Sequence, residues 1–274
     1  LAKQGNPHAI EFKRVYLEKD SLDFSFSGTK TNKVFVFDGG FYQANSYAFS
    51  GTNVTIVLKN GGTFQYGNGS SVIRNSFNFS RGKACNFTLA IQDGGLVDIR
   101  GMADFQGNED YRYSWTNCPN SAIEFSGKHP RLVCQIYGSN YEMLGLGTAA
   151  ETPLTDAVRL RYIIPEGGYE EAPFRYLKDH GNGNRGLWLY GNQPFEIALE
   201  KGYEPQRRIK VPLVYTVRKM DRTALNAARL QKFTDNAIVH LDPKKYRWKF
   251  YATTDGKTLG VEIIPITGML LLVR

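Results

Sequence analysis

Pairs of adjacent glycines recur in this chain, and each pair separates two stretches rich in β-branched and aromatic residues. An Asp or Asn precedes the pair in three places, at residues 38–40, 60–62 and 93–95, and a weaker fourth copy lies at 167–168. Asp, Asn and Gly adopt left-handed backbone conformations at low cost. Each copy therefore predicts a sharp corner between two short strands.

The spacing of these corners restricts the fold further. The pairs begin at residues 39, 61, 94 and 167, so they are separated by 22, 33 and 73 residues. A period of about 22 to 25 residues suits one coil of a parallel β-solenoid, whose repeats stack because none can bury its apolar face alone. The separation of 33 residues then corresponds to one coil with an insertion, and the separation of 73 residues corresponds to three coils. This arrangement predicts that residues 54–58 stack on residues 87–91.

The same corners are also typical of β-hairpins, so an antiparallel β-sandwich or jelly roll is the alternative. The regular spacing favours an all-β, right-handed parallel β-helix with an irregular C-terminal cap. We expect one domain over 1–274, with an N-terminal cap over 1–30, coils over 31–215 and a C-terminal helix and hairpin over 216–274. The helix is predicted at 221–232, and the hairpin turn at 255–256.

Composition excludes a disordered chain, since 42% of residues are hydrophobic and 22% charged. The net charge is +8, and residues 201–232 hold nine basic side chains against two acidic ones. Such a stretch suits phosphate, an acidic polysaccharide or an anionic surface, although a solvated face that keeps the chain soluble is the simpler explanation. Because no nucleic-acid-binding motif accompanies the charge, the sequence does not favour a nucleic acid partner.

The cysteines argue against a metal site and against a disulfide framework. Cys85, Cys118 and Cys134 form no C-x-x-C pair, and no His lies at zinc-binding spacing. Three cysteines permit at most one disulfide and leave one thiol over, and buried free thiols are the simpler expectation. We expect no metal and no cofactor. The chain has no uninterrupted apolar run of about 18 residues, so no transmembrane segment is expected.

The recurring corners resemble those of bacterial secreted right-handed parallel β-helix proteins, which include autotransporter-passenger-like proteins and the pectate-lyase-like superfamily. The resemblance covers roughly residues 30–200 and is one of rhythm, without a specific signature. It implies a secreted or cell-surface protein that binds or cleaves polysaccharide, or that serves as a rigid stalk.

The resemblance also suggests an enzymatic alternative. Arg208-Ile209-Lys210 matches a motif of polygalacturonase-like enzymes, and His180 lies in a partial copy of their Gly-His-Gly, but the paired Asp-Asp is missing. His180, Arg208 and Lys210 are therefore the catalytic candidates of a polysaccharide lyase or glycoside hydrolase acting on an acidic glycan. A lyase-type calcium site would use Asp93, Asp98 and Asp104 with Arg100, although turn-forming and solvated acids explain these residues more simply.

A loop-like stretch supplies the ligand-binding candidates Tyr111, Arg112, Tyr113 and Trp115. Aromatic rings offer flat apolar faces to sugars, and neighbouring polar groups bond their hydroxyls. Packing against the side of the solenoid is the alternative for these rings. The sequence thus predicts an extracellular or cell-surface structural or binding module with carbohydrate or another partner as ligand.

Overall fold

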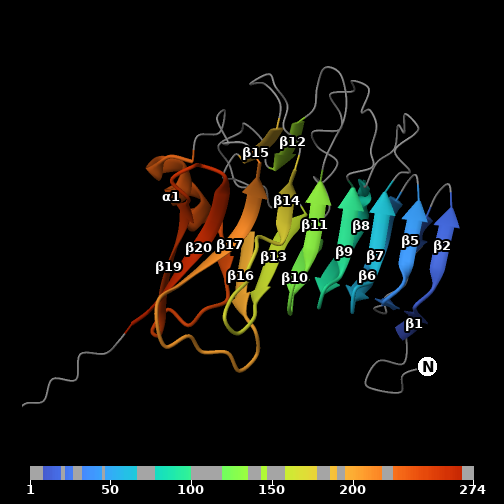
Figure 1. The fold of residues 1–274 in the computed structure, drawn as a ribbon, viewed down its shortest axis with the longest axis horizontal. Coiled ribbons are helices and arrows are strands. Elements are labelled where there is room, and N and C mark those ends of the chain that lie inside the picture. The colour runs from blue at the N-terminus through green and yellow to red at the C-terminus, as the bar shows by residue number, and fades with distance from the viewer. Residues whose placement is uncertain are drawn as a thin grey trace, which may run out of the picture.

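The structure is a computed structural model that describes residues 9–19, 22–26, 33–44, 47–66, 78–99, 119–134, 143–146, 158–177, 186–189, 195–217 and 225–266. Two nine-stranded sheets contain most of these residues (Figure 1). One α-helix, α1 (Ala227–Asn236), is found in the described part of the chain.

Sheet A is parallel throughout. Its strand order is β1-β4-β6-β8-β10-β13-β16-β18, and β3 also pairs with β6. The strands are β1 (Ala9–Lys13), β3 (Leu22–Phe26), β4 (Lys33–Asp38), β6 (Tyr47–Lys59), β8 (Asn78–Gln92), β10 (Ala122–Ser126), β13 (Arg159–Ile164), β16 (Phe195–Leu199) and β18 (Ile238–Val239).

Sheet B is parallel except at its C-terminal end, where β20 runs antiparallel to both of its neighbours. Its order is β2-β5-β7-β9-β11-β14-β17-β20-β19. The strands are β2 (Tyr16–Lys19), β5 (Phe41–Ala44), β7 (Thr63–Tyr66), β9 (Leu96–Ile99), β11 (Arg131–Cys134), β14 (Phe174–Tyr176), β17 (Ile209–Thr216), β19 (Tyr246–Ala252) and β20 (Thr258–Pro265). A separate parallel pair joins β12 (Met143–Leu146) to β15 (Gly186–Leu189).

At the corners that contain Gly61-Gly62 and Gly94-Gly95, the two glycines have different physical roles. The first glycine is left-handed, with φ of +77° at Gly61 and +79° at Gly94. The second glycine lies against the backbone of a neighbouring strand of sheet A, β4 for Gly62 and β6 for Gly95. A Cβ at Gly62 would lie 3.0 Å from the carbonyl oxygen of Phe37, and a Cβ at Gly95 only 2.4 Å from that of Leu58. The pair therefore supplies a turn and a close approach together.

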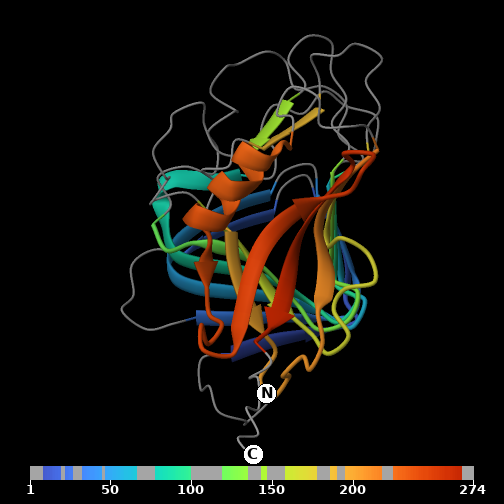
Figure 2. The ribbon, with the colours of Figure 1, turned by 90° about the vertical axis from the view of Figure 1, so that its left-hand side faces the viewer.

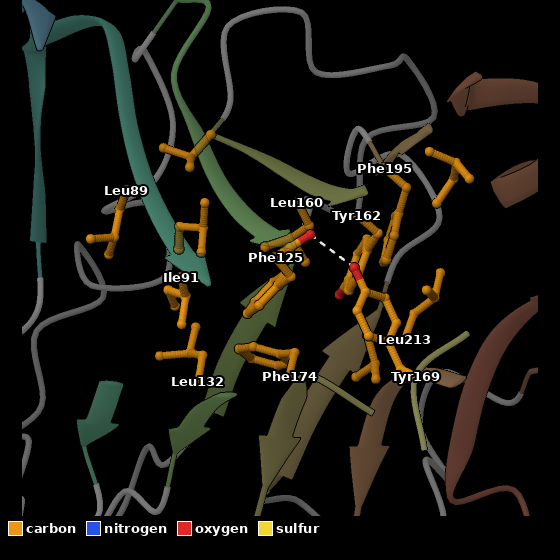
Figure 3. Packing of buried hydrophobic residues seen from close by; sticks show 14 of the residues in the cluster. Leu89, Ile91, Phe125, Leu132, Leu160, Tyr162, Tyr169, Phe174, Phe195 and Leu213 are labelled. Atoms are coloured by element: carbon orange, nitrogen blue, oxygen red, sulfur yellow. Dashed lines mark hydrogen bonds between the residues drawn. The ribbon is translucent and has the colours of Figure 1, made fainter. Parts of the chain in front are cut away.

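The core lies between the sheets and consists of alternate side chains of their strands. Rings from β10, β13 and β16 form a buried column, with centroids 5.0 Å apart for Phe125 and Tyr162 and 6.1 Å apart for Tyr162 and Phe195 (Figure 3). The buried hydroxyl of Tyr169 donates to the carbonyl oxygen of Phe125 at 2.8 Å and also reaches that of Ile163. Burial of such rings is the main stabilising contribution to a sheet pair of this kind.

Residues 54–58 lie beside residues 87–91, as the spacing of the corners predicted. In β6 and β8 the parallel partners are Val54 with Phe87, Ile56 with Leu89, and Leu58 with Ile91.

The predicted fold class is nevertheless wrong. We expected an all-β right-handed parallel β-helix with an irregular cap, whereas the structure has two large, mostly parallel sheets with one helix, an α/β-like arrangement of parallel sheets. The antiparallel sandwich is also wrong, because antiparallel pairing among the described strands is confined to β17, β19 and β20. A corner motif specifies a turn and its neighbour, but it does not specify how the whole set of sheets is assembled.

The C-terminal part of the described chain forms a regular helix and a regular strand pair. The predicted hairpin around residues 255–256 is formed by β19 and β20. The helix, however, begins at Ala227 and ends at Asn236, several residues later than predicted. The side chain of Asn226 accepts a hydrogen bond from the backbone N–H of Arg229 at 2.9 Å and so fixes the N-terminus. Phe233 is buried against Phe195 and Phe250, so α1 covers this end of the sheets (Figure 2).

Candidate functional site

The outer surface of the three C-terminal strands of sheet B carries a cluster of cations. In β17 and β19, inward side chains such as Val211 and Phe250 are buried, whereas Lys210, Arg247 and Lys249 are exposed. This alternation is the two-residue period of a strand with one face in the core. We call Arg208, Lys210, Arg247, Lys249 and the carboxylate Glu262 between them the basic face.

Strand register places these residues together. Glu262 of β20 pairs with Lys210 of β17 on one side and with Lys249 of β19 on the other. Arg208 Nε donates to Glu262 Oε1, and Lys249 Nζ lies 3.4 Å from Oε2. Arg247 forms no ion pair with any residue that the structure describes. The face consists of four cations and one carboxylate, which two of the cations contact, so it carries three net positive charges.

The carboxylate at the centre is ionised under ordinary conditions. The hydrogen bond from Arg208 holds the pKa of Glu262 below its usual value, and it outweighs the opposing effect of burial with help from Lys249. Only 1% of the Glu262 side chain is exposed, while those of Arg208 and Lys249 are each 58% exposed. The cations therefore cover the anion and present their remaining N–H donors to solvent.

An aromatic ring fixes part of this face. Lys210 Nζ lies 5.3 Å from the centroid of the Tyr251 ring, within cation–π range. The ring lies across Gly260, where a Cβ would come within 2.6 Å of ring atoms. Burial raises the pKa of the Tyr251 hydroxyl, so it is neutral at physiological pH. The Tyr251 ring thus holds the charge of Lys210 on this face.

The structure brings together only two of the candidate residues named from the sequence, Arg208 and Lys210. The other candidates, His180, Tyr111, Arg112, Tyr113 and Trp115, lie outside the described residues. Sequence reasoning missed Arg247, Lys249 and Glu262, which become neighbours of Arg208 and Lys210 only through antiparallel register. The exposed positions of Arg247 and Lys249 alternate with Tyr246, Trp248 and Phe250, and that alternation was the available signal.

The structure describes two of the four residues considered for a calcium site, Asp93 and Asp98. Asp93 has φ of +41°, and its carboxylate accepts a hydrogen bond from the N–H of Lys128, as expected of a turn residue. Asp98 is buried on β9, and Arg100 and Asp104 lie outside the described residues. Within the part of the chain that the structure describes, no group of three His, Cys, Asp or Glu side chains could hold a metal ion.

Cys134 is a free, buried thiol. Burial, with a smaller contribution from the charge of Asp98, raises its pKa well above the usual value. The thiol is thus protonated and chemically inert at neutral pH.

A second charged cluster crosses the outer surface of sheet A. Glu124, Arg161 and Glu196 are direct neighbours on β10, β13 and β16. Arg161 contacts both carboxylates at 3.1 Å, and His240 Nε2 lies 2.8 Å from Glu196 Oε1. An ionised carboxylate can only accept, so Nε2 carries the proton in this hydrogen bond. We call Glu124, Arg159, Arg161, Glu196 and His240 the charged ladder.

Two hollows lie among the turns that connect the sheets. One, of about 320 Å³, is lined by residues 127–131 and 165–171. A neighbouring one of about 510 Å³ is lined by Glu166, residues 200–204 and Gln206. Acidic and basic side chains are mixed in both, and the basic face lies in neither. No helix in the described residues is long and apolar enough to cross a membrane.

Comparisons with known proteins give only short matches. The tRNA N6-adenosine threonylcarbamoyltransferase of Clostridioides difficile is 72% identical over 32 residues, which is 12% of this chain and 10% of that enzyme. The enzymes of the same name from Moorella thermoacetica and Desulfitobacterium hafniense are 64% and 67% identical over 31 and 30 residues. The chain spans about a tenth of the length of these relatives. No family model and no solved structure matches.

These matches correct the predicted function. We expected a secreted or cell-surface carbohydrate-binding module, with a polysaccharide lyase or hydrolase as the alternative. The similarity found is instead to enzymes named for tRNA modification, and the arrangement of parallel sheets gives no support to a secreted β-helix. The resemblance to β-helix proteins, the acidic-glycan partner and the extracellular location remain sequence-based expectations that no comparison tests.

Proposed function

We propose that this protein binds tRNA through the basic face and acts in tRNA modification as a tRNA-binding component. The observation that carries the proposal is the group of four cations on the outer surface of sheet B, two of which cover the single carboxylate among them. Phosphate contacts from Lys and Arg provide most of the affinity of proteins for nucleic acid, through release of condensed counterions.

The chemistry of the face suits phosphate groups. Arg247 offers a planar set of N–H donors with no described ion pair to break, and Arg groups bind phosphate in a bidentate manner. Lys210 and Lys249 are point charges on β17 and β19, the two strands that flank β20, with Lys249 near Glu262 and Lys210 near Tyr251. Because these side chains belong to strands, little ordering is required when a polyanion binds.

Two further observations support the proposal, and the first of them favours tRNA over other polyanions. The short matches are all to enzymes whose name specifies tRNA as substrate. The chain also has a net charge of +8, which favours fast association with nucleic acid. The proposal concerns binding, because the matches cover about a tenth of the relatives and do not bring their catalytic reaction to this chain.

The test is a salt titration of binding with fluorescently labelled tRNA. We expect the double variant Arg247→Gln/Lys249→Gln to bind about ten-fold more weakly near 0.1 M salt. The slope of log K against log salt should fall by roughly 1.5 to 2, the amount for two lost phosphate contacts. Glutamine keeps most of each side-chain stem, so packing on the face changes little.

The matched control is Lys13→Gln, whose side chain is 69% exposed on β1 at the far end of the sheets. It removes a charge without touching the basic face and should leave the salt slope unchanged. Unlabelled tRNA and polygalacturonate serve as competitors, because an acidic glycan offers the same charge. Equal salt slopes for the wild type and the double variant, or preferential displacement by the glycan, would overturn the proposal.

A further inference from the structure

The four cations of the basic face lie on both sides of β20. On one line across the strands, Lys210 of β17 and Lys249 of β19 both pair with Glu262 of β20. On a second line, Arg247 of β19 pairs with Ile264 of β20. The strand order β17-β20-β19 therefore leaves one central strand between the cations of β17 and those of β19 (Figure 1).

Arg208 completes the second line from the opposite side. It directly precedes Ile209, the first residue of β17, and Ile209 pairs with Ile263 of β20. The antiparallel register, extended by one residue, places Arg208 opposite Ile264. The basic face therefore consists of two rails with two cations each. We call them the β17 rail, Arg208 and Lys210, and the β19 rail, Arg247 and Lys249.

The geometry of a sheet sets the spacing of the two rails. Neighbouring strands lie about 4.8 Å apart, so two strands that flank a third are roughly 10 Å apart. Residues two positions apart on one strand are separated by about 7 Å. The side chains of Arg208 and Lys249 are each 58% exposed, and Lys210 and Arg247 are also exposed. Positive charge thus follows two separate lines that face solvent.

Two tyrosine rings on the same surface are already covered by cations. Lys210 Nζ lies 5.3 Å from the centroid of the Tyr251 ring, and Gly260 lies against the same ring. On β17, the ring of Tyr215 has the guanidinium carbon of Arg175 at 5.1 Å from its centroid. Proteins that hold unpaired nucleic acid stack its bases on open aromatic rings. Neither of these two rings offers such a platform.

We propose that the basic face binds a double-helical arm of the tRNA and spans its two strands, with one rail on the phosphates of each strand; this inference rests on the proposed function. An A-form arm has a deep, narrow major groove, so its two backbones approach each other across that groove. An unpaired RNA has one backbone and meets one rail at a time. Phosphate contacts carry no base sequence, so the face recognises the shape of an arm and not the bases of a loop.

The test compares the binding of two RNA probes to the whole protein. One is an RNA hairpin that reproduces a helical tRNA arm, and the other is an unpaired RNA of the same length and base composition. Because the hairpin meets both rails, its slope of log K against log salt should be steeper by roughly 2 than that of the unpaired RNA. We expect the unpaired RNA to bind about ten-fold more weakly near 0.1 M salt.

Three variants test how the arm is held. Lys210→Gln and Arg247→Gln each remove one cation from a different rail, and each should lower the salt slope of the hairpin by about 0.9. Tyr215→Leu removes a covered ring and should change the affinity for tRNA by less than about two-fold, whereas loss of a stacked base would weaken binding about five-fold or more. Circular dichroism of each variant verifies folding.

The outcomes separate this inference from the proposed function. Binding of tRNA that is insensitive to Arg247→Gln/Lys249→Gln would overturn both. If tRNA binds through the basic face, three results would overturn the helical-arm inference alone. These are equal salt slopes for the hairpin and the unpaired RNA, a hairpin slope that changes in only one of Lys210→Gln and Arg247→Gln, and a loss of about five-fold or more in Tyr215→Leu.

Discussion

At the scale of single residues, the paired glycines have two separate requirements. The first glycine must adopt positive φ, as Gly61 and Gly94 do. The second must have no side chain, because a neighbouring strand of sheet A passes directly over it. That strand is β4 at Gly62 and β6 at Gly95. The sequence argument recognised only the left-handed conformation, since close approach between layers depends on partners that are distant in the chain.

This distinction predicts unequal costs of alanine substitution. Gly95→Ala should lower the free energy of unfolding by about 3 kcal/mol, because its Cβ would lie 2.4 Å from the carbonyl oxygen of Leu58. Gly61→Ala meets no atom within 4 Å and has only the backbone strain of positive φ, about 1 kcal/mol. Urea unfolding of both variants measures the difference, and equal losses would contradict the assigned roles.

At the scale of strands, the charged ladder connects three neighbouring strands of sheet A, β10, β13 and β16, with His240, the residue that follows β18. Burial alone would raise the pKa of Glu196, but the hydrogen bond from His240 and the charges of Arg161 and Arg159 outweigh it and hold this pKa below its ordinary value of 4.5. A carboxylate whose pKa is lower in the folded state stabilises the fold above the ordinary value. That contribution is lost as the pH falls through the folded pKa.

We therefore expect Glu196→Gln to lower the free energy of unfolding by about 2 kcal/mol near pH 7. The difference from the wild type should shrink as the pH falls through the lowered folded pKa of Glu196, below which Glu196 is protonated in both states. The control is Glu204→Gln, which removes an exposed ion pair with Lys245 and should cost less than about 0.5 kcal/mol. Urea titrations at several pH values measure both variants, and a difference that is independent of pH would refute the ladder's role.

At the scale of the whole molecule, sequence reasoning succeeded where the information was local. The Gly-Gly corners and the alternation of Val54, Ile56 and Leu58 predicted the neighbour of β6, and Asp255-Gly256 predicted the terminal hairpin. The fold class was wrong because the corners do not specify how the sheets are assembled. The helix was placed too early because its N-cap is Asn226, which lies inside the predicted span of 221–232.

The sequence could not predict the basic face and the charged ladder, for a related reason. Arg208 and Glu262 are 54 residues apart, and Glu196 and His240 are 44 apart, so only strand register brings them together. The basic stretch was recognised as a patch for an anionic partner, but the partner was not favoured to be a nucleic acid. That preference changed with the short tRNA-enzyme matches, which no property of the composition could reveal.

Protection of single lysines from chemical acetylation tests the proposed tRNA-binding surface most directly. The protein is briefly acetylated with and without excess tRNA, and modification at each lysine is measured by mass spectrometry. We predict that tRNA lowers acetylation of Lys210 and Lys249 several-fold, since phosphate would occupy their ammonium groups, and leaves Lys13 unchanged. Unaltered acetylation of Lys210 and Lys249 at saturating tRNA, or protection of Lys13 instead, would contradict the account.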